Sequence, residues 1–120
     1  MADHNDLGNK GEELAFTYLV KKGYEILNRN YRFKRNEIDI VAQINNTLII
    51  IEVKTRASRF LAGPEETVTK SKQKTIIKVA NDYIQEHEVD LDTRFDIISI
   101  ILNEKETTIE HLVDAFYPTL

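Results

Sequence analysis

The chain contains no cysteine, which excludes disulfide bonds and thiolate metal sites and suits a reducing compartment such as the cytoplasm. No apolar run approaches the ~20 residues that a membrane helix needs. The first six residues are polar and acidic, unlike a signal peptide, and the sequence shows no internal repeat or low-complexity segment. These absences predict a cytoplasmic protein with one domain over residues 1–120 and no membrane partner.

The charged residues are distributed unevenly along the chain. Charged residues make up 30% of the sequence and hydrophobic ones 42%, which is enough for a buried core, and the net charge is −4. Residues 28–78, however, hold eleven basic and five acidic residues, whereas the remainder is strongly acidic. This segregation favours a polyanionic partner at one face, although charge blocks are about as often ordinary solvated surface.

Two strands joined by a tight turn are predicted near the middle of the chain. Alternating and apolar patterns cover residues 37–43 and 47–54, and Asn45-Asn46 lies between them. Asparagine tolerates a positive φ, so this pair can form a two-residue primed turn. Ile44 then pairs with Thr47, which fixes the register of the whole hairpin.

This register brings two acidic side chains together. Asp39 is expected opposite Glu52 and Glu37 opposite Lys54, all on one face, with Val41 and Ile50 beside them. The other face is apolar and carries Ile38, Ile40, Ala42, Ile49, Ile51 and Val53. Two carboxylates about 5 Å apart repel by roughly 3 kcal/mol at an effective dielectric of ~20. A divalent cation or a shared proton would relieve this repulsion; the alternative is an exposed corner with a Glu37–Lys54 ion pair.

The remaining pattern predicts an α/β fold. A helix over residues 5–22 precedes a first strand at 24–32, whose polar part at 28–30 is expected to leave the sheet. After the hairpin, a loop over 57–63 and Pro64 lead to a helix over 69–86, a buried strand over 95–102 and a weaker strand over 107–113. The order α-β-β-β-α-β-β predicts a mixed central sheet flanked by helices.

Several helix residues are candidates for contact with the hairpin. Gly8 and Gly11 lie on the inner face of the first helix and predict close approach to the sheet. Glu12, at the edge of that face, is expected to lean over the sheet or to be solvated. Lys72 and Gln73 begin the apolar stripe of the second helix, so they point into a polar site or extend to the surface.

Other polar residues are expected to be structural. Arg94 and Asp96 predict an ion pair at the start of a strand. The three histidines, which show no ligand spacing, are expected to be ordinary surface or strand residues: His4, His87 and His111.

The motifs together resemble the YraN family of small bacterial proteins. The resemblance rests on Gly8-Asn9-Lys10-Gly11-Glu12, Asn30-Tyr31-Arg32, Glu37-Ile38-Asp39-Ile40-Val41, Glu52-Val53-Lys54-Thr55-Arg56, Lys72-Gln73 and Arg94-Phe95-Asp96. That family looks like a branch of the PD-(D/E)XK nucleases, close to archaeal Holliday-junction resolvases. The resemblance implies a restriction-endonuclease-like αβββαβ core, although Ile38 stands where the motif has a proline.

The resemblance also implies a role for each motif residue. Asp39, Glu52 and the backbone carbonyl of Val53 would hold Mg²⁺ or Mn²⁺, with Glu12 joining through a water molecule. Lys54 would be the motif amine, and the second helix would supply Gln73 or Lys72. The implied reaction is hydrolysis of a phosphodiester bond in a nucleic acid.

The implied partner is a nucleic acid, most simply branched or structured DNA, with RNA left open. Basic residues near the acidic pair are candidates for phosphate contact: Arg32, Lys34, Arg35, Arg56 and Lys72. Symmetric cleavage of two strands calls for a two-fold homodimer. The alternative function is a nucleic-acid-binding module that keeps the nuclease fold but does not cleave.

Overall fold

The helices and strands follow one another in the predicted order. The computed structural model describes residues 4–58 and 68–118. The elements are α1 (His4–Lys21), β1 (Glu25–Phe33), β2 (Asn36–Ile44), β3 (Thr47–Arg56), α2 (Lys70–Glu86), β4 (Asp92–Leu102) and β5 (Thr107–Phe116). The polar stretch at 28–30 stays within β1, contrary to expectation, and Asn28 and Arg29 pair with β2. Most of the loop predicted over 57–63, and Pro64 after it, lie outside the described residues.

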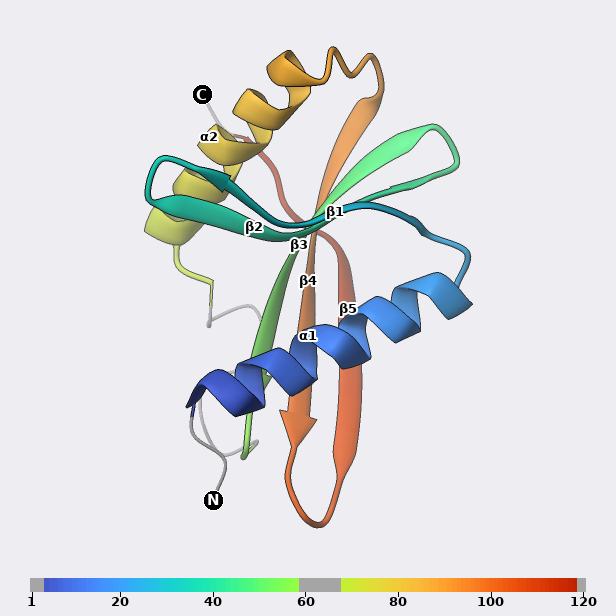
Figure 1. The fold of residues 1–120 in the computed structure, drawn as a ribbon, viewed down its shortest axis with the longest axis vertical. Coiled ribbons are helices and arrows are strands. Elements are labelled where there is room, and N and C mark those ends of the chain that lie inside the picture. Colours follow the sequence, from blue (N-terminus) through green and yellow to red (C-terminus); the bar gives the residue numbers. More distant parts are fainter. Residues whose placement is uncertain (1–3, 59–67, 119–120) are drawn as a thin grey trace.

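The strands form one five-stranded sheet in the order β1-β2-β3-β4-β5 (Figure 1). All neighbouring pairs are antiparallel except β3 and β4, which run parallel over ten residue pairs. A parallel pair needs a long crossover, and the segment containing α2 supplies it. The mixed α/β architecture predicted from the sequence is therefore confirmed.

Local sequence signals account for the element boundaries. The turn between β2 and β3 has positive φ at Asn45 (49°) and Asn46 (61°), as a primed two-residue turn requires. Gly23, with φ of 94°, follows the end of α1 in the left-handed conformation that favours glycine. The Thr69 side chain accepts a hydrogen bond from the Lys72 amide and caps the start of α2.

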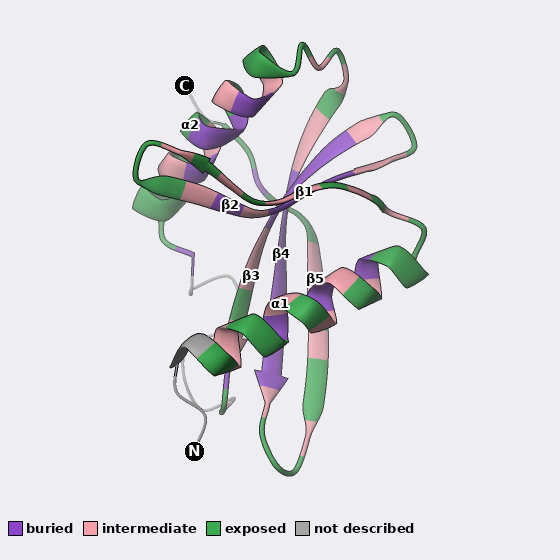
Figure 2. Ribbon diagram, viewed as in Figure 1, coloured by how far each residue is buried: buried purple, intermediate pink, exposed green. Residues whose placement is uncertain are grey.

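Two hydrophobic cores lie on opposite faces of the sheet, one under each helix. The α1 side buries side chains such as Ala15, Leu19 and Ile51, and the α2 side buries Ile50 and Val79. Figure 2 shows the buried positions concentrated along the central strands and on the inner sides of the helices. β3 and β4 are covered on both faces, so side chains on both of their faces are buried. This explains why their sequences are almost continuously apolar.

The pattern of faces predicted for β2 is wrong at Ile38. This side chain packs in the core on the α2 side, whereas Ile40 packs in the core on the α1 side. The change of face coincides with a distortion in β1, where Asn30 has a positive φ of 55° between the pairs Arg29↔Ile40 and Tyr31↔Ile38. This distortion interrupts the alternation of side chains in both strands at the level of Asp39.

In the part of the chain that the structure describes, neither helix is long and apolar enough to cross a membrane.

Candidate functional site

The predicted register is confirmed over five residue pairs of the hairpin, from Ile44↔Thr47 to Ile40↔Ile51, but the backbone pairing stops there. Beyond it, β3 continues beside β4, while β2 stays beside β1. The direct opposition expected for Asp39 and Glu52, and for Glu37 and Lys54, is therefore absent from the ladder.

The two acidic side chains nevertheless meet where β2 and β3 part. The carboxylate of Asp39 takes the place of a backbone acceptor, because its Oδ2 accepts a hydrogen bond of 2.8 Å from the Val53 amide. Val53 directly follows Glu52, so this bond brings the Asp39 carboxyl group close to Glu52, whose charge raises the pKa of Asp39. The side chains thus converge by a route that regular strand pairing does not predict.

The surroundings of Asp39 favour its protonated form. Burial raises the pKa of its carboxyl to about 8, and the charge of Glu52 and the hydrogen bond between the two carboxyl groups act in the same direction. The Val53 amide lowers the pKa of Asp39, whereas the charge of Glu37 raises it. A proton held between two carboxylates reduces their electrostatic repulsion. A cation bound at the same place would reduce it in the same way.

Helix α2 places a lysine against the acidic pair. The Nζ atom of Lys72 lies 3.6 Å from Oε2 of Glu52, whose side chain is only 12% exposed. The cap at Thr69 binds the Lys72 amide and so fixes the first turn of the helix. Of the two α2 candidates, Lys72 is the one that reaches the pair, while the side-chain amide of Gln73 donates to the carbonyl of Val68.

Helix α1 approaches the same place from the other face of the sheet. Gly11 is buried against Thr55 of β3, so closely that a Cβ atom at Gly11 would overlap that side chain. Gly8 has no such contact, so the expected close approach holds for Gly11 alone. The next residue, Glu12, accepts a hydrogen bond of 3.0 Å from the side chain of Asn30.

Glu12 is electrostatically linked to the acidic pair. Burial raises the pKa of its carboxyl, the Asn30 hydrogen bond lowers it, and the charges of Asp39 and Glu37 raise it. Glu12 also lines an open hollow of about 580 Å³, together with Asn9, Glu13, Arg29, Asn30 and Glu37. Among residues 4–58 and 68–118, no three histidine, aspartate or glutamate side chains come together as a metal-binding group.

The remaining predicted site residues lie in different environments. The side chain of Lys54 is exposed, and Glu37 forms its ion pair with Arg32 at 3.4 Å rather than with Lys54. Lys34 and Arg35 are exposed in the turn between β1 and β2. The side chain of Arg56 is buried, with 8% of its surface exposed. The predicted roles of these residues in metal and phosphate binding stay predictions.

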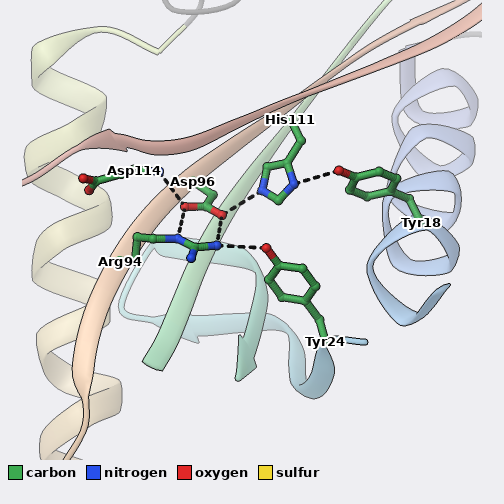
Figure 3. A network of polar contacts seen from close by, with 6 residues as sticks. All are labelled: Tyr18, Tyr24, Arg94, Asp96, His111 and Asp114. Carbon is green, nitrogen blue, oxygen red and sulfur yellow. Dashed lines mark hydrogen bonds and ion pairs between the residues drawn. The ribbon is translucent and has the colours of Figure 1, made fainter. Parts of the chain in front are cut away.

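A second polar cluster, centred on Asp96, was only partly predicted (Figure 3). The expected ion pair is confirmed, because Arg94 donates to both carboxylate oxygens of Asp96 at 2.9 and 2.8 Å. His111 lies 2.7 Å from Asp96 and 2.9 Å from the Tyr18 hydroxyl, so it does more than an ordinary strand residue. The amide of Asp114 also donates to Asp96.

The physical role of this cluster is to join distant parts of the chain. It connects β4 with β5 and, through the tyrosine hydroxyl of Tyr18, with α1. Arg94 also donates to the hydroxyl of Tyr24. Burial acts to raise the pKa of Asp96, but the hydrogen bonds from His111, Arg94 and the Asp114 amide hold it below its ordinary value. The spacing Arg-x-Asp signals the ion pair, but no local signal identifies His111 as its partner.

Comparison with known proteins identifies the family. The model of the Uncharacterised protein family UPF0102 matches residues 11–100. The UPF0102 protein of Christiangramia forsetii is 50% identical over 117 residues, covering 98% of each chain. That of Phocaeicola vulgatus is 46% identical over 120 residues, covering 100% of this chain and 99% of the relative.

Among solved structures, the chain is similar to Pyrococcus furiosus SfsA, solved in complex with Ca²⁺. The identity is 10% and the TM-score 0.39, and the match covers 86% of this chain and 62% of the SfsA chain. The family match spans the two strands that carry Asp39 and Glu52, and the relatives match over nearly their full length. The chain therefore belongs to the UPF0102 family.

Proposed function

We propose that this protein is a metal-dependent nuclease that hydrolyses phosphodiester bonds in DNA. The observation that carries the proposal is the pair formed by Asp39 and Glu52: two carboxyl groups, largely buried and in contact, at the point where two strands part. Such a pair costs free energy in a fold unless a proton or a cation relieves it. The resemblance to the PD-(D/E)XK nucleases supports the same reading of these residues.

The donor atoms fit a hard divalent cation. Mg²⁺ and Mn²⁺ prefer oxygen ligands, and Mg²⁺ is commonly held by one or two carboxylates while water and substrate phosphate complete its coordination. Asp39 and Glu52 would supply the carboxylates and Val53 a backbone carbonyl, with Glu12 acting through water. When bound, the ion would acidify a water molecule and neutralise charge that develops on the phosphate.

The chain's own cations have complementary tasks. Lys54 would orient the attacking water or stabilise the negative charge of the transition state. Lys72 neutralises Glu52 in the present structure, at 3.6 Å, and would move toward the substrate phosphate once an ion is bound to the carboxylate. Arg32, Lys34 and Arg35 lie exposed near the end of β1 and would contact phosphates further along the substrate.

Calorimetric titration with Mn²⁺ tests the metal site. We expect one binding event per chain for the wild type, and its loss in Asp39→Ala, because one of two carboxylate ligands is removed. Asp90→Ala is the matched control, since it removes an exposed carboxylate in the segment between α2 and β4. Equal heats for the wild type and Asp39→Ala would exclude the proposed metal site.

Cleavage assays test the reaction. Duplex, single-stranded and four-way-junction DNA are incubated with Mg²⁺ or Mn²⁺, and we expect Glu52→Ala to cleave at least ~100-fold more slowly than the wild type. Equal rates would assign the activity to a contaminant. Binding that weakens steeply with salt, without cleavage of any substrate, would instead establish the alternative of a non-catalytic nucleic-acid-binding module.

A further inference from the structure

A groove lies between α2 and the segment that follows β5, away from the acidic pair. Its volume is about 380 Å³, and it is lined by Lys70, Gln73, Lys74, Ile77, Lys78, Tyr117 and Pro118. The end of β5 runs past α2 in Figure 1, which places these two segments side by side. None of the residues that line this groove is acidic.

Three lysines form a row along one side of the groove. Lys70, Lys74 and Lys78 recur every four residues, so they lie on the same side of α2, each about 6 Å further along the helix axis. All three are exposed. Within residues 4–58 and 68–118, no carboxylate lies within ion-pair distance of their ammonium groups.

Among the residues that the structure describes, no acidic side chain forms an ion pair with this row of lysines. Like charges four residues apart destabilise a helix by a few tenths of a kcal/mol per pair, so the arrangement gains nothing for folding. The three lysines belong to the segment 28–78, which holds eleven basic and five acidic residues in a chain whose net charge is −4. The groove is therefore complementary to a polyanion with regularly spaced charges.

An aromatic ring stands at the same groove. Tyr117 is 68% exposed, although it directly follows Phe116, which is buried. The ring of Phe116 stacks on that of Phe95 with centroids 5.2 Å apart, and this contact anchors the backbone from which Tyr117 projects. Exposed aromatic rings beside lysines are typical of surfaces that bind single-stranded nucleic acids, where the ring stacks on a base.

We propose that this groove binds a single-stranded stretch of nucleic acid, with the three lysines on consecutive phosphates and Tyr117 stacked on a base. The proposal rests on the proposed function, because it assigns the groove to the flank of the same substrate. The first turn of α2 carries Gln73, which lines the groove, and also Lys72, which contacts Glu52 from a different side of the helix.

Fluorescence anisotropy with a labelled single-stranded DNA 15-mer tests the groove, with EDTA present to prevent cleavage. The triple substitution Lys70→Gln, Lys74→Gln and Lys78→Gln is expected to weaken binding at least ten-fold. It should also reduce the slope of log affinity against log salt by about 2, since each phosphate contact in a single strand contributes about 0.7. The matched control changes three exposed lysines elsewhere: Lys10→Gln, Lys21→Gln and Lys105→Gln.

Substitutions of Tyr117 separate stacking from charge. Tyr117→Ala is expected to weaken binding about ten-fold, whereas Tyr117→Phe keeps the ring and stays within two-fold of the wild type. Polyglutamate serves as a competitor without bases. The proposal is overturned if the control triple weakens binding as much as the groove triple, if Tyr117→Ala binds like the wild type, or if polyglutamate competes as well as unlabelled DNA.

The proposal for the groove and the nuclease proposal can be refuted independently of each other. If Asp39→Ala loses Mn²⁺ binding and the wild type cleaves DNA, but the groove triple binds and cleaves normally, the groove proposal alone is wrong. If no variant or substrate shows cleavage, but the groove substitutions weaken binding as expected, the nuclease proposal alone is wrong.

Discussion

At the scale of single residues, Asp39 combines a structural and a chemical role. Its carboxylate accepts the Val53 amide at 2.8 Å, as a backbone carbonyl would in a regular ladder, and its pKa is raised by burial and by the charge of Glu52. Asp96 repeats the structural part of this arrangement, because its carboxylate accepts the amide of Asp114, a residue with positive φ. The two aspartates differ in their neighbours: Asp96 meets the cation of Arg94, and Asp39 meets another acid.

The raised pKa of Asp39 predicts how stability depends on pH without metal. A carboxyl whose pKa is near 8 when folded and about 3.9 when unfolded favours folding while it is protonated. This contribution is fully present below the unfolded pKa and is lost as the pH rises toward 8 and beyond. We expect the unfolding free energy of the metal-free protein to fall between pH 5 and 8.5, by on the order of a few kcal/mol from this group.

Urea denaturation at pH 5, 6.5 and 8.5, with EDTA present, measures this dependence. Because Asp96 and other groups also titrate, the decisive quantity is the difference between the wild type and Asp39→Asn, which keeps the shape but cannot ionise. The asparagine variant should lose most of the decline, whereas Asp90→Asn, at an exposed position, should retain it. A wild type whose stability rises relative to Asp39→Asn over this range would contradict the assigned pKa shift.

At the scale of elements, helix α1 packs on the sheet through its hydrophobic core, and two further contacts fix its position. Gly11 meets the Thr55 side chain of β3, and Tyr18 meets His111 of β5. The first contact sets the height of the helix above the sheet beside Glu12. The second ties the far part of the helix to Asp96, so both contacts determine where Glu12 is held.

The glycine contact predicts opposite effects for two similar substitutions in α1. Gly11→Ala should destabilise the protein by about 1–3 kcal/mol, because the new methyl group overlaps Thr55 and the helix must shift. Gly8→Ala, which has nothing within 4 Å, should stabilise the protein by up to ~1 kcal/mol, since alanine is the better helix former. Thermal and urea unfolding measure both, and equal effects of the two variants would refute the packing argument.

The Asp96 cluster predicts that one conservative substitution, Asp96→Asn, will greatly lower the free energy of unfolding. Asp96→Asn should cost about 3–5 kcal/mol, because it leaves the charge of Arg94 without its buried partner and disturbs the contact with His111. The control is Glu13→Gln, which breaks the exposed ion pair with Arg29 and should cost less than ~1 kcal/mol. Urea denaturation compares the two, and a loss below ~1 kcal/mol for Asp96→Asn would show that the cluster is not structurally important.

At the scale of the whole molecule, the twisted sheet brings the two helices to one acidic site. The helices cover opposite faces, yet Glu12 of α1 is linked to Asp39 by charge and Lys72 of α2 contacts Glu52. This is possible because β2 and β3 part at that end, so side chains from both faces reach the gap. Basic residues around the β1–β2 turn and along α2 would then hold a polyanion on either side of it.

The expected homodimer is a prediction at this scale. Cleavage of two strands at symmetric positions requires two active sites related by a two-fold axis. We expect light scattering after size exclusion, over a concentration series, to give twice the mass of one chain, either for the free protein or when it is bound to a four-way junction. A single chain bound to one junction at saturation would exclude paired cleavage by a symmetric dimer and leave only nicking of one strand.

The sequence by itself determined the order of elements, the turn at Asn45-Asn46 and the register from Ile44↔Thr47 to Ile40↔Ile51, because these follow from local periodicity and turn chemistry. The sequence also predicted that Asp39 and Glu52 lie close together, because extending the hairpin register places them opposite each other. How they meet was decided only in the folded molecule.

The tertiary structure decided the rest because those features depend on contacts between distant segments. A positive φ at Asn30 coincides with the change of face at Ile38, and the β2–β3 ladder ends at Ile40↔Ile51, where the Asp39 side chain accepts the Val53 amide instead. His111 meets Asp96 because β5 pairs with β4 and places His111 opposite Ile98, two residues from Asp96. Periodicity fixes which face a side chain takes in a regular strand, but it cannot locate the irregular positions at which strands bend and part.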